Sequence, residues 1–312
     1  MTGVTVRAPA KINLQLSVGP RRGDGYHDLV TVFHAISLFD EVTVAAVDRP
    51  GPDRVLVSGE GAGSVPGGRD NLALKAAAAL ARAAGIARDP GRPLEIRIRK
   101  RIPVAAGLAG GSADAAAALV ACNELWGLGL GPGQLGEVAS EVGSDVAFAL
   151  LGGTAVGQGR GERLSPALAS GEYHWVLAVA DGELSTPAVY AALDRLRHPG
   201  PGPEPDLDQA LMGALRSGDP AAVGRALGND MEAAAVSLFP ALRKTLAAGR
   251  ELGALGAIVA GSGPTCVFLA ADADRALDLA VALSGAGVCR AVARASGPAP
   301  GAAVIPSPPG SP

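Results

Sequence analysis

Residues 94–126 read LEIRIRKRIPVAAGLAGGSADAAAALVACNELW, and this stretch decides the fold. Apolar residues alternate with charged ones from Leu94 to Arg99, which is typical of a half-buried strand. The alanine-rich run from Ser112 to about Trp126 predicts a helix. A glycine-rich segment, Pro103 to Ser112, joins the two, so the sequence predicts a strand, a tight loop and a helix in succession.

This loop has the chemistry of a phosphate-binding segment. Glycines allow the backbone to approach a ligand closely, and the free N–H groups at the start of the following helix favour an anion. Ser112 is well placed both to cap the helix and to offer its hydroxyl to a phosphate or its Mg²⁺. The segment is neither a Walker A loop nor a GxGxxG motif. An ordinary strand–helix turn would explain it about equally well.

The bulk composition indicates a globular protein and excludes several classes. The chain has 312 residues, of which 48% are hydrophobic and 18% charged, and its net charge of -3 argues against a nucleic-acid binder. Its three cysteines lack CxxC spacing and its four histidines form no HxH or HxxxH pair, so we expect neither a disulfide nor a protein-bound metal. We find no signal peptide and no apolar run of the ~20 residues that a membrane helix needs, and expect a cytoplasmic protein.

The segment from Lys11 to Val18 predicts a second strand. Its alternation places Lys11 and Asn13 on one face, opposite Ile12, Leu14 and Leu16. The chain contains only four lysines among 27 Lys and Arg residues, so a lysine is less expected where any surface cation would serve. Lys11 is therefore either a solvated strand residue or a compact cation that stabilises a transferring phosphoryl group. Composition leaves this choice open.

Two further sites combine a structural and a functional interpretation. Asp145 follows Gly143-Ser144 and precedes an apolar run, so it suits a helix N-cap or a general base. Tyr26 and His27 follow a Gly-Asp-Gly turn, where large rings bury poorly. They either cover a neighbouring strand or bind the flat base of a ligand.

Together these segments resemble the galactokinase–homoserine kinase–mevalonate kinase–phosphomevalonate kinase superfamily over about residues 4–293. Three motifs occur in the expected order: residues 8–14 (APAKINL), residues 103–112 (PVAAGLAGGS) and residues 258–268 (IVAGSGPTCVF). The match is closest to the members that phosphorylate a cytidylated methylerythritol. The segments that carry it are residues 22–29 (RGDGYHDL), 70–73 (DNLA), 107–116 (GLAGGSADAA) and 143–146 (GSDV).

The resemblance implies a role for each matching residue. Asp145 matches the catalytic aspartate and Lys11 the lysine beside it. The substrate-binding positions are Asn13, Tyr26, His27 and Tyr190, the last as a second aromatic ring against the cytosine. The ATP-binding positions are Asn71, Pro103, Val104, Ala105, Ala106, Gly107, Leu108, Ala109, Gly110, Gly111, Ser112 and Ala113.

The resemblance also implies a fold, a reaction and partners. The fold is α+β, a two-domain small-molecule kinase fold with a ribosomal protein S5 domain 2-like N-terminal half and a ferredoxin-like C-terminal half. We expect domains at residues 1–160 and 161–295 and a disordered Pro/Gly-rich tail at 296–312. The reaction is the transfer of phosphate from ATP, carried with Mg²⁺, to the 2-hydroxyl of the cytidylated polyol in the non-mevalonate isoprenoid pathway. We expect a monomer or homodimer with no nucleic-acid or membrane partner.

Three alternatives remain beside this interpretation. The nearest is another kinase of the same superfamily, which the hairpin aromatics and Tyr190 argue against. A catalytically inactive nucleotide-binding sensor would lack the lysine and aspartate pair, and an RNA-binding module suits neither the acidic balance nor the scarcity of lysine. Ala106, Ala147 and Leu151 depart from residues common in the superfamily, which puts fine positioning and rate in doubt.

Overall fold

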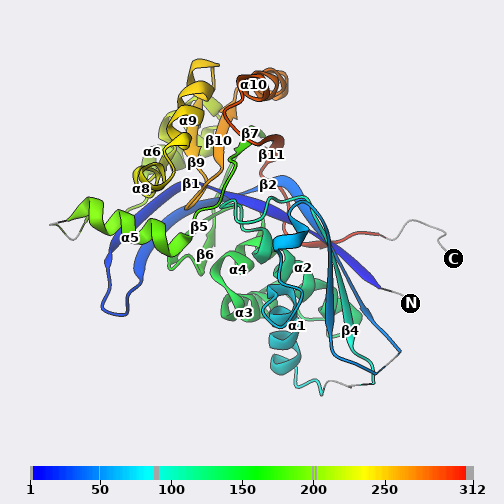
Figure 1. The fold of residues 1–312 in the computed structure, drawn as a ribbon. Coiled ribbons are helices and arrows are strands. Elements are labelled where there is room, and N and C mark those ends of the chain that lie inside the picture. Colours follow the sequence, from blue (N-terminus) through cyan, green and yellow to red (C-terminus); the bar gives the residue numbers. More distant parts are fainter. Residues whose placement is uncertain (1–2, 49, 88–90, 199, 201, 307–312) are drawn as a thin grey trace.

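The computed structural model describes residues 3–48, 50–87, 91–198, 200 and 202–306, and its core is built on two β-sheets (Figure 1). The larger sheet has eight strands in this part of the chain, with β12-β1-β2-β4-β3 as its main order. Its strands are β1 (Val4–Arg21), β2 (His27–Ala46), β3 (Arg54–Gly59), β4 (Leu94–Lys100), β5 (Thr154–Gly159), β6 (Arg163–Pro166), β8 (Gly228–Asn229) and β12 (Ala303–Val304).

The long β1–β2 hairpin organises the molecule. It crosses between two groups of helices, coloured cyan to green on one side and yellow to orange on the other (Figure 1). The predicted strand at Leu94 to Arg99 is confirmed as β4, which pairs antiparallel with β2.

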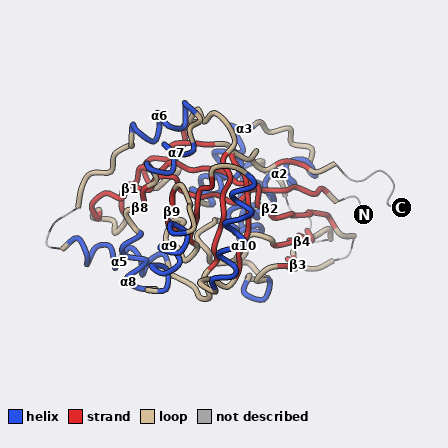
Figure 2. Tube along the Cα trace, turned by 90° about the horizontal axis from the view of Figure 1, so that it is seen from above, coloured by secondary structure: helices blue, strands red, loops and turns tan. Residues whose placement is uncertain are grey.

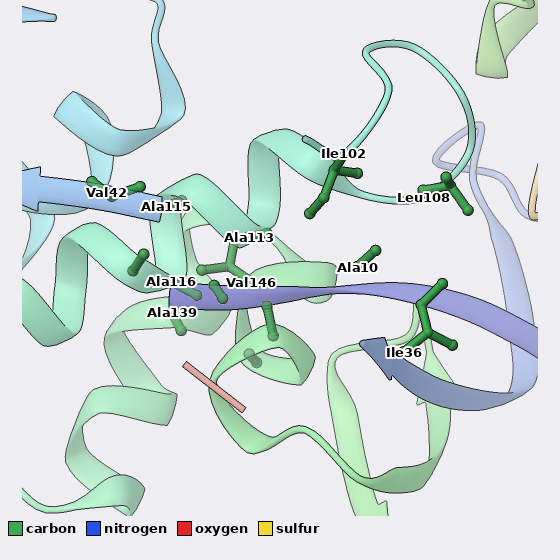
Figure 3. Close-up of a cluster of buried hydrophobic side chains, with 14 of the residues drawn as sticks. Ala10, Ile36, Val42, Ile102, Leu108, Ala113, Ala115, Ala116, Ala139 and Val146 are labelled. Carbon is green, nitrogen blue, oxygen red and sulfur yellow. The ribbon is translucent and has the colours of Figure 1, made fainter. Parts of the chain in front are cut away.

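The N-terminal helices cover one face of this sheet. They are α1 (Leu72–Ala83), α2 (Gly110–Leu125), α3 (Pro132–Val142) and α4 (Ser144–Leu151), and the short helix η1 (Ala62–Ser64) precedes them. Alanines of α2 such as Ala113 and Ala116 are fully buried against Ala10 and Val42 of the hairpin (Figure 3). Because alanine side chains are small, α2 packs closely on the strands, and its first turn is fixed beside the hairpin.

The second sheet has the order β11-β7-β10-β9, and all its strand pairs are antiparallel. Its strands are β7 (Tyr173–Val179), β9 (Gly256–Val259), β10 (Cys266–Ala270) and β11 (Ala291–Gly297). Numbered along the chain, this is the 4-1-3-2 order of a ferredoxin-like sheet. The predicted ferredoxin-like C-terminal half is therefore confirmed.

Helices pack around the second sheet and extend toward the hairpin (Figure 2). They are α5 (Thr186–Arg197), α6 (Gln209–Ser217), α7 (Pro220–Ala226), α8 (Glu232–Leu238), α9 (Ala241–Glu251) and α10 (Ala273–Ala286). β6 pairs with β5 in the first sheet, so the chain first passes from the first sheet to the second through residues 167–172. The domain limits at residues 160 and 295 stay predictions.

The expected disordered tail is wrong for its first part. Residues 296 and 297 end β11, and β12 pairs with β1 through Val304 and Val6. Ala299 is buried beside Phe33 and Phe148. Edge pairing and burial order this segment although its composition is rich in proline and glycine. Residues 307–312 lie outside the described residues.

The predicted strand faces are correct only as far as Leu14. The β1–β2 register shifts between Asn13 and Gln15, and this irregularity reverses the alternation. Leu16 consequently pairs with Thr31 and packs in the hydrophobic cluster that contains Phe268, whereas Ile12 and Leu14 lie in the larger cluster that contains the alanines of α2. Among the residues that the structure describes, none of the helices has the length and apolar character needed to cross a membrane.

Candidate active site

A cavity of about 440 Å³ lies over the start of α2. Every residue from Pro103 to Ser112 except Leu108 lines it, together with Asn71, Lys100 and Asp114. The predicted glycine-rich loop is therefore the wall of a cavity large enough for part of a nucleotide.

The N-terminus of α2 is open to an anion. The helix begins at Gly110, and Ala109 takes the N-cap position in a left-handed conformation with no side-chain cap. The first-turn N–H groups thus have no side-chain acceptor. Ser112 lies inside the first turn of α2, so its predicted role as the N-cap is wrong. This residue lines the cavity, where the hydroxyl could contact a ligand.

The loop backbone holds an unusual run of conformations. Ala105, Gly107 and Ala109 all have positive φ, at 54°, 78° and 57°. A Cβ on Gly107 would lie 2.3 Å from the carbonyl oxygen of Ala260, so only glycine fits there. Ala106 keeps a negative φ, and alanine there adds no backbone strain to the loop. The departure at Ala106 is therefore compatible with the loop conformation.

Two residues of the predicted ATP site lie in the core instead of the cavity wall. Leu108 and Ala113 are buried in the larger hydrophobic cluster, the one that contains the alanines of α2 (Figure 3). The carbonyl of Leu108 accepts a hydrogen bond from the Lys11 backbone N–H at 3.2 Å. Any contribution of these two residues to a nucleotide site would come through the backbone, because their apolar side chains are held by core packing.

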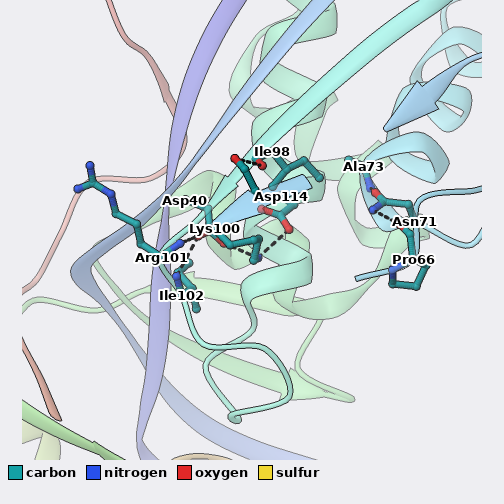
Figure 4. Close-up of polar contacts among 10 residues, drawn as sticks. Asp40, Pro66, Asn71, Ala73, Ile98, Lys100, Arg101, Ile102 and Asp114 are labelled. Atoms are coloured by element: carbon teal, nitrogen blue, oxygen red, sulfur yellow. Dashed lines mark hydrogen bonds and ion pairs between the residues drawn. The ribbon is translucent and has the colours of Figure 1, made fainter. Parts of the chain in front are cut away.

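Asn71 lines the loop cavity together with the glycine-rich segment. Its Oδ1 accepts from the Ala73 N–H at 2.9 Å, which confirms it as the N-cap of α1, and its Nδ2 donates to the carbonyl of Pro66 (Figure 4). Both side-chain groups are thus engaged by the protein. A role for Asn71 beside the adenine stays a prediction.

A buried charge cluster lies beneath the loop, and the sequence analysis missed it. Lys100 Nζ donates to Asp114 Oδ2 at 2.8 Å and also to Asp40 Oδ2, while Asp40 Oδ1 accepts the N–H groups of Arg101 and Ile102 (Figure 4). Burial raises the pKa of Asp114 to about 8, with Lys100 opposing and Asp40 adding to the shift. The scarcity of lysine was the one signal that could have identified Lys100.

The middle of the site is a smaller cavity of about 320 Å³, which both Lys11 and Asp145 line. Lys11 Nζ lies 3.8 Å from Asp145 Oδ2, and the two side chains are 10% and 32% exposed. Gly143 is the N-cap of α4, so Asp145 lies in the first turn with its carboxylate free of a capping role. The cap interpretation of Asp145 is wrong.

A chain of hydrogen bonds fixes Lys11. Its Nζ donates to Asn13 Oδ1 at 2.8 Å, Asn13 Nδ2 donates to Thr31 Oγ1 at 2.8 Å, and Thr31 donates to the carbonyl of Gln15. These groups are buried, so each partner orients the next. Lys11 and Asn13 share a face, as the alternation predicts.

The second half of the chain closes this centre with a glycine turn. A Cβ on Gly261 would lie 3.5 Å from Lys11 Nζ and 3.4 Å from Asn13 Oδ1. Asn229 Nδ2 donates to the carbonyls of Val259 and Gly261, which holds the turn in place. The third predicted motif therefore reaches the lysine and aspartate pair.

A third cavity, of about 660 Å³, contains the predicted base-binding residues Tyr26, His27 and Tyr190. His27 stacks on Tyr190, with ring centroids 4.9 Å apart, and His27 Nε2 lies 2.8 Å from Asp194 Oδ1. Burial, and secondarily the charge of Asp145, raises the pKa of Tyr190 to about 12, so its hydroxyl stays protonated.

Tyr26 lies at the open side of this cavity. It is 56% exposed, and the guanidinium carbon of Arg160 lies 5.2 Å from its ring centroid. Arg160 and Asp194 are site residues that the sequence analysis missed, because no local pattern indicates that they reach the hairpin tip.

The three cavities adjoin. Gly107 and Ala109 line both the loop cavity and the middle cavity, while Arg160 and Tyr190 line both the middle cavity and the base cavity. The Lys11–Asp145 pair therefore lies between the glycine-rich loop and the aromatic pocket.

The described residues contain no group of three or more His, Cys, Asp or Glu side chains that could hold a metal ion. The carboxylates that line the loop and middle cavities are Asp70, Asp114 and Asp145, of which Asp114 is already bound by Lys100, and Ser112 offers a hydroxyl in the first turn of α2. Mg²⁺ bound with a nucleotide is usually held by phosphate oxygens, waters and only one or two protein oxygens. This sparse donor set fits an ion that arrives with its nucleotide.

Comparison with known proteins identifies the family of the chain. Residues 71–153 match the model of the GHMP kinases N terminal domain, and residues 211–289 match that of the GHMP kinases C terminal. The chain is 58% identical to a 4-diphosphocytidyl-2-C-methyl-D-erythritol kinase of Nocardia farcinica over 97% of this chain and 96% of the relative. It is 54% identical to the kinase of the same name from Thermobifida fusca, covering 97% and 99% of the two chains.

Solved structures agree with this relationship. A crystal structure of 4-(cytidine 5'-diphospho)-2C-methyl-D-erythritol kinase superposes with a TM-score of 0.75 at 37% identity, covering 94% of this chain and 98% of that one. A homoserine kinase from Cytophaga hutchinsonii shares the fold at a TM-score of 0.74 and 20% identity, over 98% of each chain. The predicted α+β kinase fold is thus confirmed, and the chain belongs to the 4-diphosphocytidyl-2-C-methyl-D-erythritol kinase family of the GHMP kinases.

Proposed function

We propose that this chain transfers the γ-phosphate of ATP to the 2-hydroxyl of 4-diphosphocytidyl-2-C-methyl-D-erythritol, in the non-mevalonate isoprenoid pathway. The observation that carries the proposal is the position of Lys11 and Asp145 between the loop cavity and the aromatic cavity. A phosphoryl acceptor held in one cavity would meet a donor held in the other at this pair.

In the proposed reaction Asp145 accepts the proton of the substrate's 2-hydroxyl, while the oxygen of that hydroxyl forms a bond to the γ-phosphorus of ATP. The bond from that phosphorus to the β–γ bridging oxygen breaks, and ADP leaves with the electron pair. Lys11 stabilises the negative charge on the oxygens around the transferring group. Asn13 fixes the direction of the Lys11 ammonium and borders the substrate.

The loop from Pro103 to Ala113 and Asn71 form the proposed ATP site. The uncapped first-turn amides of α2 would bind phosphate oxygens, and Ser112 would add a hydroxyl. Mg²⁺ neutralises charge on the phosphates when it is bound, and Ser112 and Asp145 are the residues placed to hold it.

The aromatic cavity is the proposed site of the cytidine. Tyr26 and Tyr190 offer ring faces, and His27 offers a polar edge. Arg160 lines both this cavity and the reaction centre, so its guanidinium lies where a diphosphate would pass between base and polyol. No ion pair engages Arg160 among the described residues, which leaves it available to a substrate phosphate. Mevalonate, homoserine and galactose, the acceptors of other kinases in the superfamily, contain no base that could fill this cavity.

We further propose a two-domain organisation with a cytoplasmic location, acting as a monomer or homodimer. The catalytic domain is residues 1–160 and the substrate-side domain residues 161–295, although strand pairing extends the first sheet to Pro166. These assignments rest on the family resemblance.

A coupled assay of ADP release tests the proposed function. We expect turnover with the cytidylated methylerythritol and none above background with mevalonate, homoserine or galactose. Turnover of one of these three in preference to the cytidylated substrate would favour another kinase of the superfamily. Binding of ATP with no turnover of any substrate would favour the inactive sensor.

A further inference from the structure

The histidine of the base cavity is held by a single helix. His27 is the first residue of β2 and is only 6% exposed, and α5 presents two groups to it. Tyr190 stacks on its ring, and Asp194 lies 2.8 Å from Nε2. Because Tyr190 and Asp194 are four residues apart on α5, they project from the same face of the helix.

Within the described residues, His27 is the one partner with which Asp194 forms an ion pair or a side-chain hydrogen bond. Among the described residues this aspartate pairs with no lysine or arginine, and the nearby Arg197 is bound to Asp230 at 2.9 Å. A carboxylate only accepts hydrogen bonds, so the imidazole nitrogen that faces it must carry the hydrogen. In a neutral imidazole this leaves Nδ1 without a hydrogen, as an acceptor.

His27 Nδ1 is unengaged within the described structure. No residue of this part of the chain hydrogen-bonds to it, and it is not among the buried polar atoms that lack a partner. The nitrogen therefore borders the cavity. An acceptor at this place suits the 4-amino group of cytosine, which donates, and opposes the 4-carbonyl of uracil, which only accepts.

We propose that Asp194 is a positioning residue that makes the pocket selective for cytosine over uracil by fixing the tautomer of His27. This inference rests on the proposed function, since it assigns the selectivity of the same site. It gives a role to a carboxylate that acts through His27.

The test uses the full chain and the variants Asp194→Ala and Asp194→Asn. Alanine removes the acceptor, whereas the asparagine side chain keeps the shape but can offer either an oxygen or an NH₂ group to Nε2. The matched control is Asp181→Asn, which makes the same charge change at an exposed residue of the connection that leads into α5.

The first readout is the ratio of kcat/KM for the cytidylated substrate to that for its uridylated analogue. We expect Asp194→Ala to lower this ratio about tenfold, the worth of roughly one hydrogen bond, with the KM for ATP unchanged. Asp194→Asn should fall between wild type and alanine, and the control should match wild type.

The second readout is the ¹⁵N NMR spectrum of the protein labelled at histidine, which contains only four histidines. A His27→Gln variant assigns the signals of His27. We expect a hydrogen on Nε2 in the wild type and a mixture of tautomers in Asp194→Ala.

An unchanged substrate ratio in Asp194→Ala would overturn the proposal, and so would a wild-type His27 with its hydrogen on Nδ1. An equal loss of the ratio in the Asp181→Asn control would also contradict it. Failure of the wild type to turn over the cytidylated substrate would instead refute the proposed function. In that case the tautomer of His27 alone decides whether Asp194 positions it.

Discussion

Replacement of Lys11 by methionine tests the centre of the mechanism. Methionine keeps the length and apolar stem of lysine, so packing near the Phe33 ring, 5.5 Å from Nζ, is largely preserved. What disappears is the ammonium 3.8 Å from Asp145 Oδ2 and its hydrogen bond to Asn13.

The magnitude follows from Coulomb's law at that distance. Two unit charges 3.8 Å apart interact by about 1 kcal/mol in water and about 4 kcal/mol at an effective dielectric constant of 20. Lys11 is nearly buried while Asp145 is about one-third exposed, so the site lies between these limits. If Lys11 stabilises the transferring phosphoryl group to a similar degree, kcat should fall by a factor of about 5 to 10³.

Single-turnover rapid quench with labelled ATP isolates the chemical step from product release. We expect the single-turnover rate constant of Lys11→Met to be lower than that of the wild type by a factor within that range. In steady-state assays the KM for ATP should change less than about threefold, because ATP binding is assigned to the loop. The matched control is Lys244→Met, at an exposed position on α9. A Lys11→Met rate within twofold of wild type, in a folded protein, would refute the assignment of Lys11 to the transition state.

Three further predictions concern the groups around this centre. Gly107→Ala should raise the KM for ATP and cost about 1–3 kcal/mol of unfolding free energy, because the added Cβ would lie 2.3 Å from the Ala260 carbonyl at a positive φ; Gly136→Ala in α3, where a Cβ meets nothing, is the control in urea titrations. The folded-state pKa of Asp114 is raised from 3.8 to about 8, so the unfolded chain releases this proton first and unfolding free energy falls as pH rises between those values, by up to about 1.4 kcal/mol per pH unit. Asp114→Asn should flatten that slope in urea titrations at pH 5 and pH 8, and parallel pH profiles would contradict the shift. Arg160→Ala should weaken binding of CDP about 10- to 100-fold more than binding of cytidine in calorimetry, as a charge-assisted hydrogen bond to phosphate requires. The control is Arg163→Ala, at the exposed first residue of β6, which should not show this difference. Equal losses for both ligands in Arg160→Ala would contradict the diphosphate role.

Local chemistry was sufficient for much of the fold and for part of the site. The strand that begins at Leu94 and the open loop before α2 both follow from alternation and glycine content within a few residues. The residues of the three motifs were also identifiable as a set, because they match one family's pattern in order.

Other features depend on contacts that no short segment encodes. The register shift after Asn13 moves Leu16 to the other core, and it arises from pairing with β2 rather than from the alternation itself. The last strands are ordered because β12 finds an edge at β1, which composition cannot indicate.

The sequence by itself determined the kinase fold, and it identified the glycine-rich loop, Lys11, Asp145 and the hairpin aromatics as the candidate site residues. Only the tertiary structure decided which groups serve them: Asp194 is 167 residues from His27, and Gly261 reaches Lys11 from the other half of the chain. The physical reason is range. Backbone propensity and capping act over a few residues, whereas hydrogen bonds and ion pairs act between whichever side chains the packing of the two sheets brings within 3 to 4 Å.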